Sequence, residues 1–200
     1  MNRLVLASGN VGKLREFAQL FAPLGIKLLP QSAFNVPDAV EPHLTFVENA
    51  LTKARHCSQI TGLPALADDS GLCVSALDGA PGVHSARYAG EPKSDARNND
   101  ALLQALRGKN SRAAHYVCVL ALCRHADDPQ PLIAEGEWHG EILDMPRGEN
   151  GFGYDPLFFV PTHDCSAAEL DAIEKNRISH RGRALQLLLQ NLPPRLRIES

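Results

Sequence analysis

The chain has 200 residues, enough for one domain that buries roughly 70% of the surface that its unfolded form exposes. Its composition, with 44% hydrophobic and 22% charged residues, 15 Gly and 14 Pro, is typical of a soluble globular protein. This composition excludes a collagen, a coiled coil and a disordered tail. The net charge of −3 gives no broad electrostatic attraction to nucleic acid or to an anionic membrane.

Cysteine content and the N-terminal segment predict a cytoplasmic location. The five cysteines are an odd number without the spacing of a zinc site, so we expect reduced thiols rather than a disulfide framework. The N-terminal apolar run ends at Ser8, too early for a signal peptide, and no segment approaches a membrane span. Basic residues gather only between Lys175 and Ser200, where a solvated helix and tail would explain at least half of them.

The pattern of apolar residues predicts alternating strands and helices. Strands are expected at 4–7, 65–67, 72–76, 116–123 and 157–160, with two more between 132 and 143 around Gly136 to Gly140. Helices are expected at 14–21, at 45–62 after a capping box of Thr45 and Glu48, at 95–106, after Ser166 with Glu169 as its cap, and from Ser179 to Leu192. The stretch 78–91 is expected to be a Gly and Pro loop.

The first turn, Ser8-Gly9-Asn10-Val11-Gly12-Lys13, places two glycines, small polar side chains and a lysine at a helix N-terminus. Free backbone N–H groups and the helix dipole favour an anion there, which indicates a phosphate site. It is not a Walker loop, because the glycine spacing is too short and Leu14 replaces the Ser or Thr that would bind magnesium. A loop that merely turns the chain is the alternative.

The adjacent carboxylates Asp68 and Asp69 follow an expected strand. Such a pair can share a divalent cation or leave one carboxylate as a base, and Glu41 is a third acid that could reach the same ion. Taken alone, the segment is more typical of an Asx turn, and loop acids are usually solvated.

Three further polar groups are candidates for a binding site. Asn49, Lys53 and His56 share the helix face opposite the apolar stripe, which a solvated surface would also explain. The segment Gly151-Phe152-Gly153-Tyr154-Asp155-Pro156 suits either a planar ligand or a turn anchored in the core by its aromatic side chains. Ser179-His180-Arg181-Gly182 opens the last helix, where the arginine could bind oxygen acceptors or be exposed at a helix cap.

Five segments in a fixed order carry a resemblance to a known family. They are the first turn, Thr45-Phe46-Val47-Glu48-Asn49-Ala50, Ala67-Asp68-Asp69-Ser70-Gly71-Leu72, Phe152-Gly153-Tyr154-Asp155-Pro156 and Ser179-His180-Arg181-Gly182. Together they resemble the inosine triphosphate pyrophosphatase family, and within it the bacterial members that act on dITP and XTP. Each motif is weak alone, but the ordered set is highly specific and extends from about Leu4 to Leu192.

The resemblance implies a fold and an assembly. The fold would be α/β, of the ITPase-like, Maf and Ham1 type, with a long twisted mixed β-sheet flanked by helices and two lobes with a nucleotide cleft between them. Residues 1–200 would form a single such domain, with the tail 193–200 outside the shared region and without an assigned function. The protein would be a homodimer, with no nucleic acid or membrane as partner.

The same resemblance implies an activity and its residues. Family members hydrolyse ITP, dITP and XTP to the monophosphate and pyrophosphate, which clears deaminated purines from the nucleotide pool. The cofactor would be Mg²⁺, held by Glu41 and Asp69, with Asp69 also activating the attacking water and Phe152 stacking on the base. The substrate-binding residues implied are Ser8, Gly9, Asn10, Val11, Gly12, Lys13, Lys53, Ser70, Phe152, Gly153, Tyr154, Asp155, Lys175, His180 and Arg181.

The chemistry of phosphoryl transfer agrees with these roles. Phosphate charges need lysines and backbone amides to neutralise them, and magnesium prefers carboxylate and phosphate oxygens. Water must attack the α-phosphorus in line, and an ionised Asp69 can orient or deprotonate it. Donors from His180 or Arg181 aimed at O6 would reject a 6-amino base, because a buried donor would then face a donor.

One departure and two alternatives accompany this interpretation. Family members usually carry Glu-Thr-Gly where this chain has Glu41-Pro42-His43-Leu44, so Glu41 is the less supported of the two metal ligands. A related group cleaves dTTP and UTP, but its first loop carries Ser-x-Ser-x-x-Arg where this chain has Gly12-Lys13. A non-catalytic nucleotide sensor would not need to retain Asp68, Asp69 and both lysines.

Overall fold

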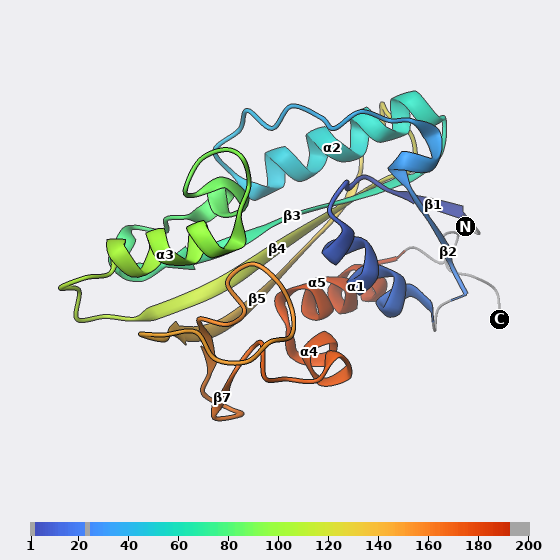
Figure 1. The fold of residues 1–200 in the computed structure, drawn as a ribbon. Coiled ribbons are helices and arrows are strands. Elements are labelled where there is room, and N and C mark those ends of the chain that lie inside the picture. Colours follow the sequence, from blue (N-terminus) through green and yellow to red (C-terminus); the bar gives the residue numbers. More distant parts are fainter. Residues whose placement is uncertain (1–2, 23–24, 193–200) are drawn as a thin grey trace. The chain divides into compact units, whose positions relative to one another are not determined.

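Residues 3–22 and 25–192 are described by the computed structural model, and they form an α/β protein with one seven-stranded sheet (Figure 1). The strand order is β2-β1-β3-β4-β5-β6-β7. β1 is parallel to β2 and β3, whereas β6 is antiparallel to β5 and β7. The predicted class, a mixed sheet flanked by helices, is confirmed. The predicted tail at 193–200 lies outside the described residues.

The elements alternate along most of the chain. The strands are β1 (Arg3–Leu6), β2 (Lys27–Pro30), β3 (Ala65–Val74), β4 (Ala113–Cys123), β5 (Leu132–Ile142), β6 (Phe158–Val160) and β7 (Cys165–Ser166). The α-helices are α1 (Val11–Phe21), α2 (Phe46–Thr61), α3 (Asp95–Ala105), α4 (Ala172–Ile178) and α5 (His180–Gln190), and short 3₁₀ turns lie at Gln31–Phe34, Ser75–Leu77 and Gly82–Arg87.

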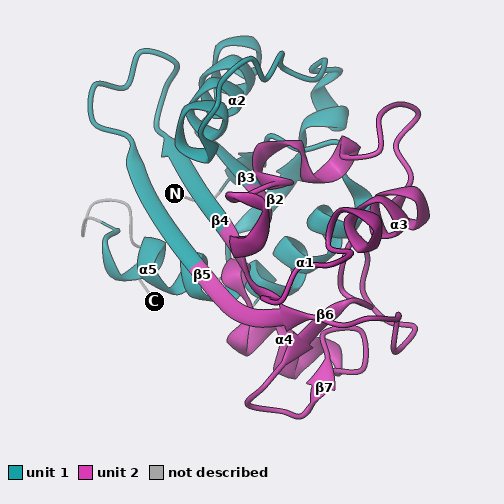
Figure 2. Cartoon of the chain, turned by 90° about the vertical axis from the view of Figure 1, so that its left-hand side faces the viewer, with its two compact units in different colours: residues 1–69, 118–136, 182–200 teal, residues 70–117, 137–181 magenta. Residues whose placement is uncertain are grey.

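The chain divides into two compact units, coloured separately in Figure 2. Unit 1 comprises residues 1–69, 118–136 and 182–200, and unit 2 comprises residues 70–117 and 137–181. Each unit has its own apolar core. In unit 1, Phe17 and Phe21 of α1 pack with Leu185 and Leu188 of α5. In unit 2, the aromatic side chain of Trp138 packs among aliphatic and aromatic neighbours from β3, β4 and β6.

In unit 1, α1 and α5 lie on one side of the sheet and α2 lies on the other (Figure 1). α1 begins at Val11, three residues before the predicted start, whereas the predicted cap of α2 at Thr45 is confirmed. Asn10 accepts a hydrogen bond from the N–H of Lys13, and Thr45 accepts one from the N–H of Glu48. α2 ends at Gly62, whose φ of 65° lies in the left-handed region that glycine adopts without strain.

Two strands are longer than predicted. The two short strands expected around Asp68 and Asp69 are one continuous strand, β3, so these carboxylates lie inside a buried strand and not in an Asx turn. Burial is possible because lysines from outside the strand pair with both acids. The two strands expected between 132 and 143 are likewise one strand, β5, whose side chains alternate between buried and exposed through Gly136 and Gly140.

Other boundaries also differ. The strands β2 and β7 were not predicted, since both are short and lack a clear apolar alternation. The predicted helix cap at Ser166 is wrong, because Glu169 accepts from the N–H of Ser166 in a turn that follows β7. The helix begins later, at Ala172, where Asp171 caps it by accepting from the N–H of Glu174.

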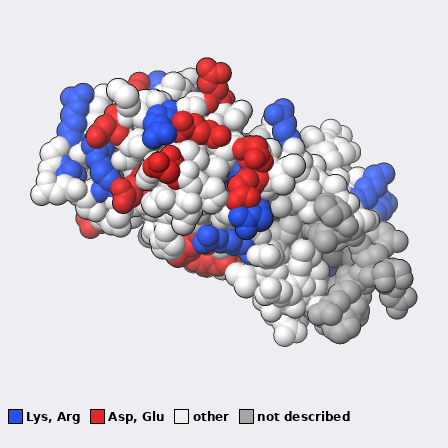
Figure 3. Space-filling model, turned by 90° about the horizontal axis from the view of Figure 1, so that it is seen from below, with Lys and Arg blue, Asp and Glu red and all other residues white. Residues whose placement is uncertain are grey.

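The surface carries charges of both signs. Among the described residues on the face drawn in Figure 3, Lys and Arg side chains are interspersed with Asp and Glu side chains, so no continuous patch of one sign covers it. In the described part of the chain, no helix combines the length and the apolar character needed to cross a membrane.

Candidate functional site

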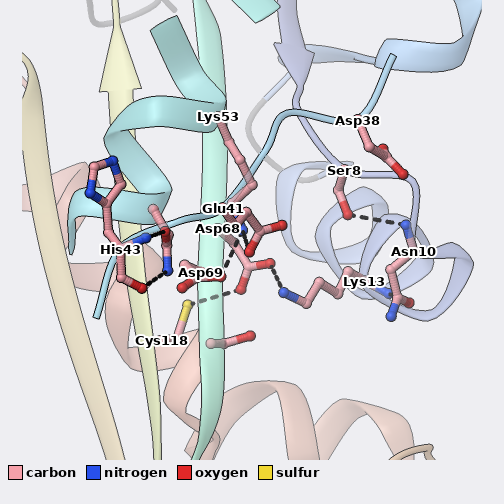
Figure 4. A network of polar contacts seen from close by, with 12 residues as sticks. Ser8, Asn10, Lys13, Asp38, Glu41, His43, Lys53, Asp68, Asp69 and Cys118 are labelled. Atoms are coloured by element: carbon pink, nitrogen blue, oxygen red, sulfur yellow. Dashed lines mark hydrogen bonds and ion pairs between the residues drawn. The ribbon is translucent and has the colours of Figure 1, made fainter. Parts of the chain in front are cut away.

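Two lysines and three carboxylates form a network in unit 1 (Figure 4). Lys13 of α1 places its Nζ 2.5 Å from Oδ1 of Asp68, whose side chain is completely buried. Lys53 of α2 places its Nζ 2.7 Å from Oδ1 of Asp69 and 3.5 Å from Oε2 of Glu41. The predicted phosphate lysines and the predicted acids are therefore brought together.

The alternation of a β-strand explains which lysine meets which acid. Successive side chains of β3 point to opposite faces of the sheet, so Asp68 and Asp69 cannot both face the same helix. Asp68 meets α1 and Asp69 meets α2, and these helices lie on opposite sides of β3 (Figure 1). The acidic dipeptide thus contributes one carboxylate to each side of the sheet.

Burial and charge oppose each other at the pair of Lys53 and Asp69. Burial lowers the pKa of Lys53, but the negative charges of Asp69, Asp68 and Glu41 outweigh it and raise this pKa above its usual value. Burial raises the pKa of Asp69, and Lys53 offsets only part of the rise. A carboxylate with a raised pKa is a stronger base than an ordinary aspartate.

The first turn is ordered by hydrogen bonds from its own side chains. Ser8 Oγ accepts from the N–H of Asn10, and Asn10 Oδ1 accepts from the N–H of Lys13, which orders the turn ahead of α1. Gly9 has no room for a side chain larger than its hydrogen without movement, because a Cβ there would lie 3.1 Å from Asp38 Oδ1. Val11 is 69% exposed, so this end of α1 is open to a ligand.

The polar face of α2 is not solvated, contrary to the simpler interpretation. Asn49 is 2% exposed and clamps His43, accepting from its N–H and donating to its carbonyl oxygen, both at 3.1 Å. His56 Nε2 lies 3.0 Å from the carbonyl oxygen of Pro37. Both contacts hold the segment that carries Glu41 against α2. Sequence reasoning missed the role of Asn49, although an asparagine inside the helix was a signal for it.

The predicted base-binding residues lie in unit 2. Asp155 is 3% exposed, and its Oδ2 accepts from the N–H of Phe152 at 2.8 Å and from Lys175 Nζ at 2.7 Å. The ring of Phe152 is partly exposed, with Lys175 Nζ and Arg181 Cζ each 5.3 Å from its centroid. This arrangement offers a planar ligand an aromatic face flanked by cations.

The segment that opens α5 is buried. His180 is 2% and Arg181 is 6% exposed, so an exposed arginine at a helix cap is wrong. Arg181 Nη2 donates to Ser70 Oγ at 2.9 Å. The imidazole of His180 stacks on the ring of Tyr116 with centroids 4.6 Å apart and an interplanar angle of 8°. Lys175, one of the basic residues between 175 and 200, is also buried, at 7% exposed, so a solvated helix does not explain it.

Tyr154 takes the role of a core anchor. Its side chain is 3% exposed and its hydroxyl donates to the carbonyl oxygen of Ser85 at 2.8 Å. Burial raises the pKa of this hydroxyl well above its usual value, which keeps it protonated. The sequence did not predict the hydrogen bonds between α3 and Gly153, nor the stacking of Tyr116 on His180. These contacts join segments that are far apart in the sequence.

Carboxylate oxygens in unit 1 fit a hard divalent cation. Oδ2 of Asp69 is buried and has no hydrogen-bond partner within the described ranges, while Oδ1 and Glu41 share Lys53. In this part of the chain no group of three or more His, Cys, Asp or Glu side chains is arranged to hold a metal ion. A cation at Asp69 and Glu41 would therefore take its remaining ligands from phosphate or water.

Comparisons with known proteins show the family of the chain. The model of the Ham1 family matches residues 4–191. A dITP/XTP pyrophosphatase of Chromobacterium violaceum is 64% identical over 96% of this chain and 97% of that protein, and one of Aromatoleum aromaticum is 66% identical over 95% and 96%. A solved HAM1 protein from Coxiella burnetii has a TM-score of 0.88 and 54% identity, over 95% of this chain and 98% of that chain. With matches of this extent, the chain belongs to the Ham1 family.

Proposed function

We propose that this protein is a pyrophosphatase that hydrolyses non-standard purine nucleoside triphosphates, such as ITP, dITP and XTP. The products would be the nucleoside monophosphate and pyrophosphate, so that the enzyme clears deaminated purines from the nucleotide pool. The names of the bacterial relatives support this substrate class. The structural observation that carries the proposal is the pairing of two lysines with two adjacent buried carboxylates.

Unit 1 supplies the groups that a triphosphate needs. Lys13, Lys53 and the open N-terminus of α1 offer cations and backbone N–H groups to phosphate oxygens. In the free protein, carboxylates already hold both lysines. Phosphate oxygens would compete with the carboxylates for these ammonium groups. The hydrogen bonds of Ser8 and Asn10 would maintain the conformation of the turn when phosphate binds.

Asp69 is the candidate base. Its carboxylate would accept a proton from a water molecule that attacks the α-phosphorus in line, and pyrophosphate would leave from the opposite side. Burial raises the pKa of this carboxylate, which makes it a stronger base than an ordinary aspartate. Asp68 pairs with Lys13 on the other side of β3, so its proposed role is to hold Lys13 in place.

Magnesium is the proposed cofactor. Asp69 and Glu41 would hold the ion, and bound Mg²⁺ would neutralise phosphate charge. Lys53 lies against both carboxylates and would have to give way, at least in part, to admit it.

Unit 2 supplies the groups that a purine needs. Phe152 would stack on the base, while Asp155, Lys175, His180 and Arg181 would present hydrogen-bonding groups to its edge. We propose that both units work together as one nucleotide-hydrolysing domain and that the protein is a cytoplasmic homodimer. Light scattering coupled to size-exclusion chromatography tests the oligomeric state.

A product assay tests the function. Purified protein with magnesium is incubated with ITP, dITP, XTP, GTP, ATP, dTTP and UTP, and the released phosphate species are identified. Pyrophosphate from ITP, dITP and XTP, with slow turnover of GTP and ATP, is the expected result. Orthophosphate would contradict attack at the α-phosphorus, preference for dTTP or UTP would indicate the pyrimidine-cleaving group, and binding without turnover would indicate a sensor.

A further inference from the structure

Gly153, next to the candidate stacking residue, has both of its backbone polar groups held by one helix. Its N–H donates to Oδ2 of Asp95 at 2.7 Å, and its carbonyl oxygen accepts from Nδ2 of Asn99 at 2.9 Å. Asp95 and Asn99 stand four residues apart on α3, so their side chains lie on the same face of the helix. α3 and the Gly153 turn are more than 50 residues apart in sequence, and both belong to unit 2.

The same turn is fixed from its other end. The N–H of Phe152 donates to Asp155 Oδ2 at 2.8 Å, and a Cβ on Gly151 would lie 2.1 Å from that oxygen. Three backbone groups of two consecutive residues, the N–H of Phe152 and the N–H and C=O of Gly153, therefore have fixed partners. The backbone on which Phe152 stands is held in one orientation, and only the two side-chain torsions of the ring remain to be set.

The contacts of Asp95 and Asn99 with Gly153 restrain the residue next to Phe152, the candidate stacking residue. α3 already has its own N-cap, since Ser94 accepts from the N–H of Arg97, so Asp95 is free to bond outside its helix. Asn99 is 9% exposed, and a buried amide that is directed at one glycine carbonyl restrains the turn strongly. A partly exposed aromatic ring on an otherwise mobile glycine turn would lose orientational freedom on binding a base, and restraint in advance removes that cost.

We propose that Asp95 and Asn99 are positioning residues for purine recognition, which hold Phe152 in the orientation that stacks on the base. The inference rests on the proposed function, in which Phe152 stacks on the purine. Neither residue needs to touch the nucleotide. Loss of the hydrogen bonds from Asp95 or Asn99 to Gly153 should weaken binding of the base. Binding of the triphosphate should stay unchanged, because the lysine and carboxylate network belongs to unit 1.

The test compares a nucleotide with a ligand that has no base. Asp95 is exposed, so Asp95→Ala should fold, and a thermal unfolding curve checks this. We expect KM for ITP to rise about 10-fold, as loss of a charged hydrogen bond to the turn would allow, with kcat little changed. The inhibition constant of inorganic tripolyphosphate should stay at the wild-type value. Asn99→Ala should give the same pattern.

Two control variants separate positioning from general damage. Asp95→Asn keeps an oxygen acceptor and should stay near the wild-type KM, while Asp100→Ala removes an exposed acid from the same helix and should change nothing. A KM for ITP in Asp95→Ala that equals that of Asp100→Ala overturns the inference. So does a parallel loss of tripolyphosphate binding, which would indicate a structural role only.

Phe152→Ala distinguishes failure of the inference from failure of the proposed function. If Phe152→Ala raises KM for ITP and Asp95→Ala does not, the proposed base site is supported and the positioning role of Asp95 is wrong. If Phe152→Ala leaves KM unchanged, the base site itself is wrong and the inference falls with it. Should no nucleotide be hydrolysed, the dissociation constants of ITP and tripolyphosphate from calorimetry replace KM and the inhibition constant in every comparison.

Discussion

The ring of Tyr116 on β4 lies flat against the imidazole of His180 at the start of α5, with centroids 4.6 Å apart and planes within 8°. Its hydroxyl also donates to Asp155 Oδ1 at 3.4 Å. One buried tyrosine therefore touches two residues that we assign to the purine. Burial is the largest effect on the pKa of Tyr116, and together with the charge of Asp155 it raises this pKa well above its usual value. The hydroxyl therefore stays a donor.

Replacement of Tyr116 should affect base recognition according to what is removed. Tyr116→Phe keeps the ring, so we expect KM for ITP to stay within about 3-fold of wild type, since only a long hydrogen bond is lost. Tyr116→Leu removes the stacking surface, and KM for ITP should rise by about 10-fold or more. Steady-state kinetics with thermal unfolding as a control measures both. Equal KM values for the two variants would contradict a positioning role for the ring.

Asp69→Asn should abolish turnover while the fold is kept. Loss of a general base lowers rates by about 10²–10⁴-fold, and the amide would also be a poorer metal ligand. Asp78→Asn is the control, since Asp78 is exposed with φ of 51°, a conformation that asparagine also tolerates. Pyrophosphate release is measured for both. Activity of Asp69→Asn close to that of the control would remove Asp69 from the mechanism.

The sequence predicted the main helices and the candidate residues, but not how the acids are buried. The capping box of Thr45 and Glu48 is a local signal, so α2 begins where expected, whereas α1 begins at Val11, before the first apolar residue of its pattern. The dipeptide of Asp68 and Asp69 is a typical turn signal, and its place inside β3 depends on Lys13 and Lys53 from two other elements. Such neutralisation involves contacts between distant parts of the chain, which local propensity does not include.

The site shows the same limit. The ordered motifs predict the site residues, and residues outside these motifs, Tyr116, Asp95 and Asn99, contact them. A tyrosine in an apolar strand and polar residues on a helix have no distinctive pattern by themselves. Their contribution follows from tertiary contacts, which a single sequence does not reveal.

Lys53→Met should increase the affinity of the free protein for a divalent cation. The ammonium of Lys53 lies against Asp69 and Glu41 and so competes with a metal ion for these oxygens. Mn²⁺ binding without nucleotide, followed by electron paramagnetic resonance, should be tighter in Lys53→Met than in wild type. Lys93→Met, at an exposed position, is the control. Unchanged Mn²⁺ affinity would argue against a cation at Asp69 and Glu41.

Lys13→Met should weaken both stability and activity, for separable reasons. Removing this cation leaves the buried carboxylate of Asp68 without its ion-pair partner, which costs about 3 kcal/mol. The double variant Lys13→Met with Asp68→Asn removes the charge as well and should recover most of the stability. It should not recover the affinity for ITP, because the triphosphate still lacks a lysine. Urea unfolding and ITP kinetics on the wild type and these two variants make this comparison.

Asp128 should contribute stability that depends on pH. Its side chain is completely buried and accepts from the guanidinium of Arg124 and from the backbone N–H groups of Arg124 and Gln130. Hydrogen bonds from the Arg124 side chain, the largest effect, hold the pKa of Asp128 far below its usual value. Asp128→Asn should therefore cost about 2 kcal/mol of unfolding free energy at pH 7.

The pH at which this stabilisation weakens follows from the direction of the shift. A carboxyl with a lowered folded-state pKa stabilises fully above its unfolded pKa of about 3.9, and the contribution declines as the pH falls toward the folded-state pKa. Between pH 5 and pH 3 the difference between wild type and Asp128→Asn should shrink by about 1 kcal/mol. Urea unfolding at both pH values measures this difference in unfolding free energy. Asp127→Asn, a substitution of the exposed neighbouring residue, is the control. A difference that stays constant over this range would show that Asp128 is not held ionised by Arg124.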